Sequence, residues 1–156
     1  TITATIDGVQ GTAQITVILN IPDLAGNWAG QWVNTTFNST GTVTMTIVVD
    51  EANHTVQFTI DVNGPAFGGG DPPPATYNGT YADGVMTITG TNANFGDLNL
   101  TWSANGVNGT LTNLPAGSGI NSVTLAGTGS ATQLNLTYDI DATWGTATGT
   151  FTINHQ

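Results

Sequence analysis

One pair of carboxylates has the spacing that acid–base or metal chemistry needs. Asp139 and Asp141 stand two residues apart, so they point to the same face of a regular strand. Opposed across a cleft, two carboxylates act as general acid and base. With a carbonyl or Asn oxygen nearby, they form half of a Ca²⁺ site instead. The remaining interpretation is two solvated carboxylates on an outer face, opposite Tyr138 and Ile140. Calcium at Asp139 and Asp141 is the one cofactor hypothesis.

The two histidines do not complete a catalytic site. His54 falls in an expected turn, and His155 is the penultimate residue, where chains are usually poorly ordered. The sequence contains no Ser/His/Asp arrangement worth naming, no EF-hand spacing and no repeated Asp-Gly motif. We therefore expect two exposed histidines and a protein that is not an enzyme.

Tryptophan is the residue type best suited to hold a small ligand. Trp28 and Trp32 are four apart on an expected strand and share its face, and Trp102 belongs to another alternating run. Exposed, these rings would stack on sugars; buried, they would anchor the core. A third possibility is an interior cavity for an apolar ligand, although the inward apolar set looks large enough to fill a small barrel. All three rings are ligand-binding candidates.

The chain contains no lysine and no arginine, which excludes several classes of function. The chain has ten acidic residues and two histidines, which gives a formal net charge of −10 over 156 residues. Without cations the protein cannot neutralise phosphates, so no nucleic-acid partner is expected. Cys is absent, which excludes a disulfide framework, and no apolar run reaches the roughly 18 residues of a membrane helix. We expect no transmembrane segment.

Apolar residues alternate with polar ones along most of the chain, which predicts strands that bury one face. Thr fills many of the polar positions, because it is β-branched and its hydroxyl tolerates water. The expected inward sets are Val43, Met45, Ile47 and Val49; Val56, Phe58, Ile60 and Val62; Met86 and Ile88; Leu98, Leu100 and Trp102; Leu134, Leu136, Tyr138 and Ile140; and Phe151 and Ile153.

Turn residues separate these runs and define the expected fold. Asp83-Gly84 predicts a two-residue hairpin turn, and Asn105-Gly106 predicts another turn. Residues 63–74 are predicted to form a surface loop. About ten short strands follow from Asn27 onward. We predict an all-β fold, an antiparallel β-sandwich or an up-and-down barrel, over residues 23–156. Residues 1–22 form a separate N-terminal strand or hairpin arm.

Seven N-x-S/T sequons make glycosylation a further hypothesis. A chain this rich in Asn and Thr produces several by chance, so the motif alone is weak evidence. The candidate acceptors are Asn34, Asn38, Asn53, Asn78, Asn99, Asn108 and Asn135.

Two segments resemble known families. Residues 1–19, T-I-T-A-T-I-D-G-V-Q-G-T-A-Q-I-T-V-I-L, resemble the last two strands of bacterial Ig-like group 2 domains. The stretches G-N-W-A-G-Q-W, G-T-V-T-M-T-I and G-T-A-T-G-T-F-T-I resemble secreted bacterial surface β-domains that are lipocalin-like and rich in Gly-Thr. Gly26-Asn27-Trp28 also fits the G-x-W of a lipocalin first strand. These resemblances imply an extracellular β-domain and transfer no catalytic residue.

A third similarity is architectural. Subunits of donor-strand filaments carry an N-terminal extension of alternating residues that completes the sheet of a neighbour. We therefore expect a secreted structural or adhesive protein of the cell surface that self-associates into a homopolymer, with glycans as a further partner. The alternative is a lipocalin-like or carbohydrate-binding module. The expected donor-arm contacts are Ile2, Ala4, Ile6, Ile15, Val17 and Leu19.

The missing cations also predict how the acids titrate. Carboxylates without cationic partners repel one another, which raises their pKa. Folding stability would then be at least as great near pH 4 as near pH 8 in low salt.

Overall fold

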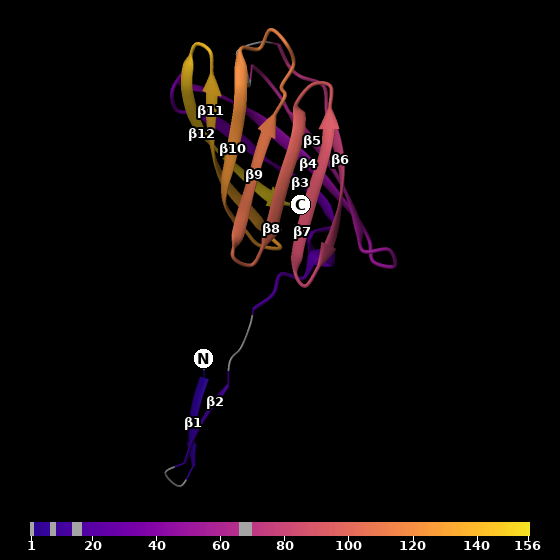
Figure 1. The fold of residues 1–156 in the computed structure, drawn as a ribbon, viewed down its shortest axis with the longest axis vertical. Coiled ribbons are helices and arrows are strands. Elements are labelled where there is room, and N and C mark those ends of the chain that lie inside the picture. The colour runs from indigo at the N-terminus through magenta and orange to yellow at the C-terminus, as the bar shows by residue number, and fades with distance from the viewer. Residues whose placement is uncertain (1, 7–8, 14–16, 66–69) are drawn as a thin grey trace.

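The fold is a closed, ten-stranded antiparallel barrel preceded by a two-stranded hairpin (Figure 1). A computed structural model describes residues 2–6, 9–13, 17–65 and 70–156. The hairpin consists of β1 (Ile2–Ile6) and β2 (Val9–Ala13), and a 3₁₀ turn, η1 (Ile21–Leu24), leads into the barrel. The barrel strands are β3 (Gly26–Asn34), β4 (Ser39–Asp50), β5 (Thr55–Val62), β6 (Ala75–Ala82), β7 (Val85–Asn92), β8 (Gly96–Ser103), β9 (Gly106–Thr112), β10 (Ile120–Gly129), β11 (Gln133–Ala142) and β12 (Gly145–His155).

Each barrel strand pairs with its neighbours in sequence, and the first pairs with the last. β12 runs antiparallel to β3, with His155 opposite Trp28 and Gly149 opposite Asn34. This pairing closes the sheet, so the prediction of an all-β up-and-down barrel is confirmed and the sandwich alternative is not realised. Closure also leaves no unpaired strand edge in the barrel.

The period-two pattern places the apolar side chains inside the barrel. β11 is the clearest case, since its ten residues alternate strictly between exposed and buried. The predicted inward sets of β4, β5, β7, β8, β11 and β12 all lie in the core or pack against it. Thr and Asn occupy the outer positions, which explains how a chain with 6% charged residues presents a polar surface.

Inward-facing glycines make room for the large aromatic rings of the interior. Gly41 lies opposite Trp32 in the register, and Gly149 lies opposite Tyr138. A Cβ on either glycine would collide with that ring and with backbone carbonyl oxygens. Small residues opposite large ones let a narrow barrel fill its interior, and glycines allow its strands to bend. The pairs Gly41-Thr42, Gly109-Thr110 and Gly149-Thr150 each combine an inward glycine with an outward threonine.

The short turns follow the local sequence. Asp83 and Gly84 both have positive φ, +51° and +73°, as a type I′ hairpin turn requires. The turns β4–β5, β6–β7, β8–β9 and β10–β11 lie at one end of the barrel, here called the lower end. The turns β3–β4, β5–β6, β7–β8, β9–β10 and β11–β12 lie at the opposite, upper end.

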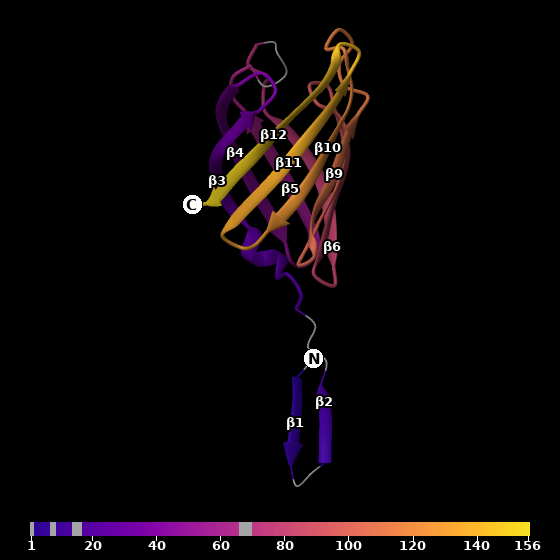
Figure 2. The same ribbon diagram turned by 90° about the vertical axis from the view of Figure 1, so that its left-hand side faces the viewer.

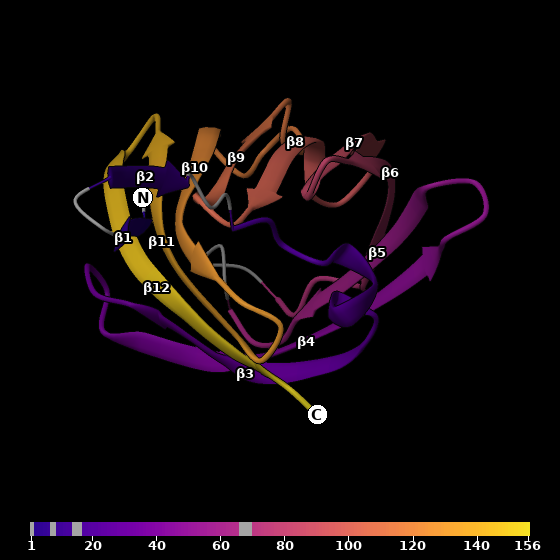
Figure 3. The same cartoon turned by 90° about the horizontal axis from the view of Figure 1, so that it is seen from below.

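The lower end is covered by η1, which lies within the outline of the barrel when seen from below (Figure 3). Ile21 and Leu24 are buried in the same core cluster as the barrel residues. Leu19 packs against that cluster as well, and Gly84 lies close against the backbone of Leu19. The boundary expected after residue 22 therefore falls inside η1, and the segment that belongs to the barrel begins near Leu19.

The hairpin β1–β2 stands apart from the barrel (Figure 2). Its strands pair only with each other among the described strands, with Ile2 opposite Ala13 and Ile6 opposite Val9. Of the expected donor-arm contacts, Val17 is 77% exposed, whereas Leu19 is used by this chain's own core. Ile15 and the side chains of Ile2, Ala4 and Ile6 lie outside what the structure describes.

Candidate ligand site inside the barrel

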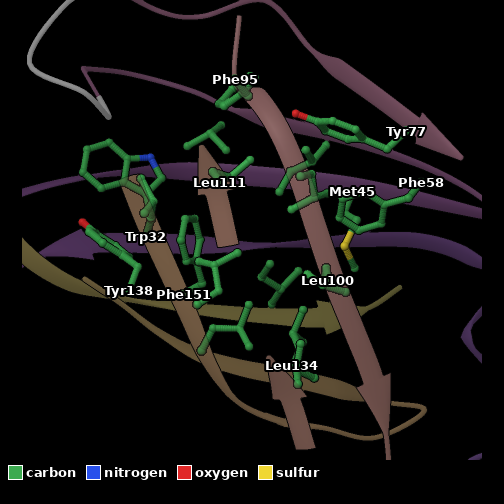
Figure 4. A pocket seen from close by; sticks show the side chains of 18 of the residues that line it. Trp32, Met45, Phe58, Tyr77, Phe95, Leu100, Leu111, Leu134, Tyr138 and Phe151 are labelled. Carbon is green, nitrogen blue, oxygen red and sulfur yellow. The ribbon is translucent and has the colours of Figure 1, made fainter. Parts of the chain in front are cut away.

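The barrel encloses an apolar cavity of about 90 Å³. Its lining residues come from β3–β6, from β8–β12 and from the turn before β8, and their side chains point towards a common interior (Figure 4). A cavity that holds one water needs roughly 10–15 Å³, so this space is large enough for a small ligand. Aromatic lining residues are Trp32, Phe58, Tyr77, Phe95, Trp102, Tyr138 and Phe151.

Trp32 is a lining ring near the upper end of the barrel. It is fully buried, and its indole Nε1 donates a 2.9 Å hydrogen bond to the carbonyl oxygen of Asn63, just after β5. Because Gly41 has no side chain, the ring can lie over β4. The ring is thus held in one orientation by a polar contact and by the adjacent strand.

Two tyrosines bring hydroxyl groups into this apolar wall. The hydroxyl of Tyr138 donates to the carbonyl oxygen of Val33 at 3.2 Å, and that of Tyr77 donates to the carbonyl oxygen of Gly96 at 3.4 Å. Burial raises the pKa of Tyr77 to about 12, and the charge of nearby Asp97 adds to this. Burial also raises the pKa of Tyr138. Both phenols therefore stay neutral at physiological pH.

Trp102 carries the one buried side-chain polar atom without a partner among the described residues, its indole Nε1. The indole edge that bears this nitrogen lies over inward-facing Gly129, where a Cβ would come within 2.5 Å. A buried donor without an acceptor costs roughly 1–3 kcal/mol. Trp102 also lines the cavity.

The lower end of the barrel interior, here called the floor, is built from stacked rings. Trp28 meets Trp102 edge to face, with ring centroids 5.7 Å apart, and donates from Nε1 to the carbonyl oxygen of Leu24 at 3.0 Å. His155 stacks flat on Trp28 at 4.6 Å and 7°. Its Nδ1 lies 3.0 Å from the carbonyl oxygen of Ala131; since a carbonyl only accepts, Nδ1 carries the proton. The expectation of an exposed His155 was wrong, because strand pairing with β3 orders the residue.

The lining contains no charged side chain. The whole sequence lacks Lys and Arg, so no cation is available to accompany an anionic ligand into the cavity. Burying an unpaired carboxylate or phosphate in an apolar cavity is strongly unfavourable. The cavity therefore suits an uncharged ligand.

The tryptophans predicted as ligand contacts differ in position. Trp32 and Trp102 line the cavity, whereas Trp28 is buried in the floor. None of these three presents a ring to solvent, so a surface platform for sugars at these positions is ruled out. Trp144, which was not among the predicted ligand contacts, is the exposed tryptophan. The sequence did contain a signal for a turn at Trp144. The next residue is a glycine, and it interrupts the apolar–polar alternation of the strand before it.

Asp139 and Asp141 point outward from β11, as the solvated interpretation requires. Asp141 accepts a 3.0 Å hydrogen bond from the side-chain amide of Asn121 on β10. Within the described residues, no group of three or more Asp, Glu, His or Cys side chains is arranged to hold a metal ion. The pair thus has no third acidic ligand there, and calcium stays a hypothesis.

The sequons divide into one buried and six exposed sites. The side chain of Asn34 is only 3% exposed and accepts hydrogen bonds from the turn that follows it, so this candidate acceptor was wrong. The exposed candidates are Asn38, Asn53, Asn78, Asn99, Asn108 and Asn135.

Two carboxylates contradict the expectation that repulsion raises the acid pKa values. Hydrogen bonds from the side chain and backbone of Asn53 hold the pKa of Asp50 below its usual value. Hydrogen bonds from Thr91 and Asn113 lower the pKa of Asp97 in the same way. Neutral donors thus replace the missing cations.

In the described part of the chain, no helix has the length and apolar character that crossing a bilayer requires. Comparison of the chain with models of protein families, with curated proteins and with solved structures gave no match.

Proposed function

We propose that the barrel binds a small, uncharged, largely apolar ligand in its interior, in the manner of a lipocalin-like module and without catalysis. The observation that carries this proposal is the apolar cavity of about 90 Å³ within a closed barrel. Pockets of this kind bind by excluding water from apolar ligand surface. The unpartnered N–H of Trp102 belongs to a ring that lines this cavity, so a ligand oxygen that reached it would satisfy a buried donor. Medium-chain alcohols and ketones have this chemistry.

Isothermal titration calorimetry with 1-octanol tests the proposal. Leu111→Phe adds bulk to a lining residue, whereas Val48→Phe adds bulk on the outer face of β4, where Val48 is exposed. We expect the wild type and Val48→Phe to bind 1-octanol with similar affinity and Leu111→Phe to bind about tenfold more weakly. Absence of binding to the wild type, or equal binding by a folded Leu111→Phe variant, would contradict the proposal.

A second role is association of the secreted protein through its N-terminal hairpin. The supporting observation is that β1 and β2 pair only with each other among the described strands. A two-stranded hairpin is at best marginally stable in water, which favours its addition to a further sheet. Because the barrel has no open edge, that sheet must come from another hairpin or another domain. In this role the chain is a module of an extracellular fibre or surface assembly.

Sedimentation velocity of the full chain and of a variant lacking residues 1–18 tests this second role. We expect the full chain to self-associate with rising concentration and the truncated barrel to stay monomeric. A full chain that stays monomeric at high concentration, or a truncated barrel that polymerises normally, would count against strand addition.

A further inference from the structure

The upper end of the barrel exposes two aromatic rings in contact with each other. Phe37, in the β3–β4 turn, is 60% exposed, and Trp144, in the β11–β12 turn, is 49% exposed. Their ring centroids lie 5.6 Å apart at an interplanar angle of 60°. Single exposed apolar residues are ordinary, but two large aromatics that meet in solvent favour an interaction site.

The turn that carries Phe37 is fixed by hydrogen bonds on both sides. The buried Asn34 side chain accepts from the backbone N–H groups of Thr36 at 3.0 Å and Phe37 at 2.9 Å. The Thr35 hydroxyl donates to the carbonyl oxygen of Thr148 at 2.9 Å, and the Thr36 hydroxyl accepts from the N–H of Thr148 at the same distance. A pre-ordered turn lowers the entropic cost of binding.

The turn that carries Trp144 is held against the neighbouring β9–β10 loop. The backbone N–H of Thr143 donates to the carbonyl oxygen of Gly119 at 2.7 Å. A Cβ on Gly119 would lie 3.2 Å from Cδ1 of Trp144, so the indole edge rests against the backbone of the β9–β10 loop. Both rings are therefore presented by anchored turns.

Hydrogen-bonding groups lie on the outer face of β11 and β12, the two strands that meet at the turn of Trp144. Asp141 on β11 lies opposite Thr146 of β12, and Asp139 lies opposite Thr148, the residue that anchors the turn of Phe37. The side-chain amide of Asn121 already orients the carboxylate of Asp141. Carboxylate and hydroxyl oxygens are acceptors for alcohol groups. This end of the barrel thus offers apolar ring faces together with acceptors for hydroxyl donors.

We infer that Phe37 and Trp144 form a stacking platform for a neutral glycan. The C–H face of a sugar ring packs on an aromatic face, while its hydroxyls donate to the outer-face oxygens of β11 and β12. The net charge of −10 opposes sulfated glycans and anionic lipid surfaces. The aromatic pair is also far smaller than the roughly 800 Å² per partner of a stable protein interface. This site is separate from the interior cavity.

Affinity electrophoresis of the full chain through gels containing xylan, galactomannan or hydroxyethylcellulose tests the inference. We expect at least one of these neutral polysaccharides to retard the wild type, and Trp144→Ala and Phe37→Ala to weaken that retardation about tenfold or more. Trp144→Phe keeps an aromatic face and should retain part of the binding. Val48→Ala, which removes exposed apolar surface from β4, serves as the matched control and should behave as wild type.

Both rings are exposed, so we expect each variant to keep the fold. Far-UV circular dichroism verifies this. No retardation by any of the polysaccharides, or unchanged retardation of Trp144→Ala, overturns the inference. Binding to phosphatidylcholine vesicles that Trp144→Ala abolishes would assign the platform to membranes and overturn the glycan assignment. Dimerisation in sedimentation velocity that Trp144→Ala abolishes would assign it to a second copy and overturn it as well.

Discussion

At the lower end of the barrel Trp28 is buried between Trp102 and His155, whereas at the upper end Trp144 is half exposed beside Phe37. The difference follows from strand pairing. Trp28 lies within β3, and the residue opposite it on β12 covers its ring. Trp144 lies in a two-residue turn between paired Ala142 and Gly145, so no strand covers it. The same residue type thus closes one end of the barrel and marks a surface at the other.

Removal of Trp28 should have the largest effect on stability. Trp28→Ala leaves a cavity in the floor and frees His155 and Trp102 from their ring contacts, so we expect a loss of about 3–5 kcal/mol. Trp144→Ala should change the free energy of unfolding by less than about 0.5 kcal/mol. Urea denaturation measures both values, and similar values for the two variants would contradict the assignment of the two ends.

Gly149 should not tolerate a side chain. A methyl group there would collide with the ring of Tyr138 and with the carbonyl oxygen of Val33, so Gly149→Ala should cost about 1–3 kcal/mol. Gly70 has open space around it, and Gly70→Ala should be neutral within about 0.5 kcal/mol. If both variants unfold at the same urea concentration as wild type, inward glycines do not shape the interior.

His155 should contribute to the floor although it stands next to the last residue. Loss of its stacking on Trp28 should make His155→Ala less stable by about 1 kcal/mol. His54→Asn, at an exposed turn with positive φ, should stay within about 0.5 kcal/mol of wild type. Equal effects of the two substitutions in urea denaturation would show that His155 is not part of the floor.

The smallest expected effect is on stability at acid pH, and it involves one carboxylate at each end of the barrel. The folded pKa values of Asp97, near the upper end, and Asp50, near the lower end, are lowered from the usual aspartate value by hydrogen bonds. Such groups stabilise the fold above their unfolded pKa, and this contribution is lost as pH falls through the folded pKa. The melting temperature should therefore drop below about pH 4, and the drop should be smaller in the double variant Asp50→Asn/Asp97→Asn. Melting curves identical at pH 3 and pH 6 would contradict this.

Much of the barrel follows from local sequence. Alternation such as Val43, Met45 and Ile47 identifies the buried face of a strand because side chains alternate with period two. Asp83-Gly84 identifies its turn because both residues adopt positive φ. Closure could not be predicted in this way, since it depends on pairing between β3 and β12, more than a hundred residues apart.

The candidate sites were less predictable for the same reason. Trp32, Trp102 and Trp144 look alike in a list of residue types, and the three-dimensional pairing of the strands shows which two line the cavity and which is exposed. The burial of Asn34 was hidden because its sequon resembles the six exposed ones. The depressed pKa of Asp97 depends on hydrogen bonds from Thr91 and from Asn113, and Asn113 is sixteen residues away and brought near by the β8–β9 hairpin.

The most direct test of the central claim compares 1-octanol with octanoate at pH 7. The two molecules have similar chains but differ in charge, and the barrel offers no cation to either. A ligand that binds only the folded state raises the melting temperature, and the rise increases with its affinity and its concentration. We expect 1-octanol to raise the melting temperature with concentration and octanoate to leave it unchanged. Equal stabilisation by octanoate, or no stabilisation by 1-octanol, would contradict an interior site for uncharged apolar ligands.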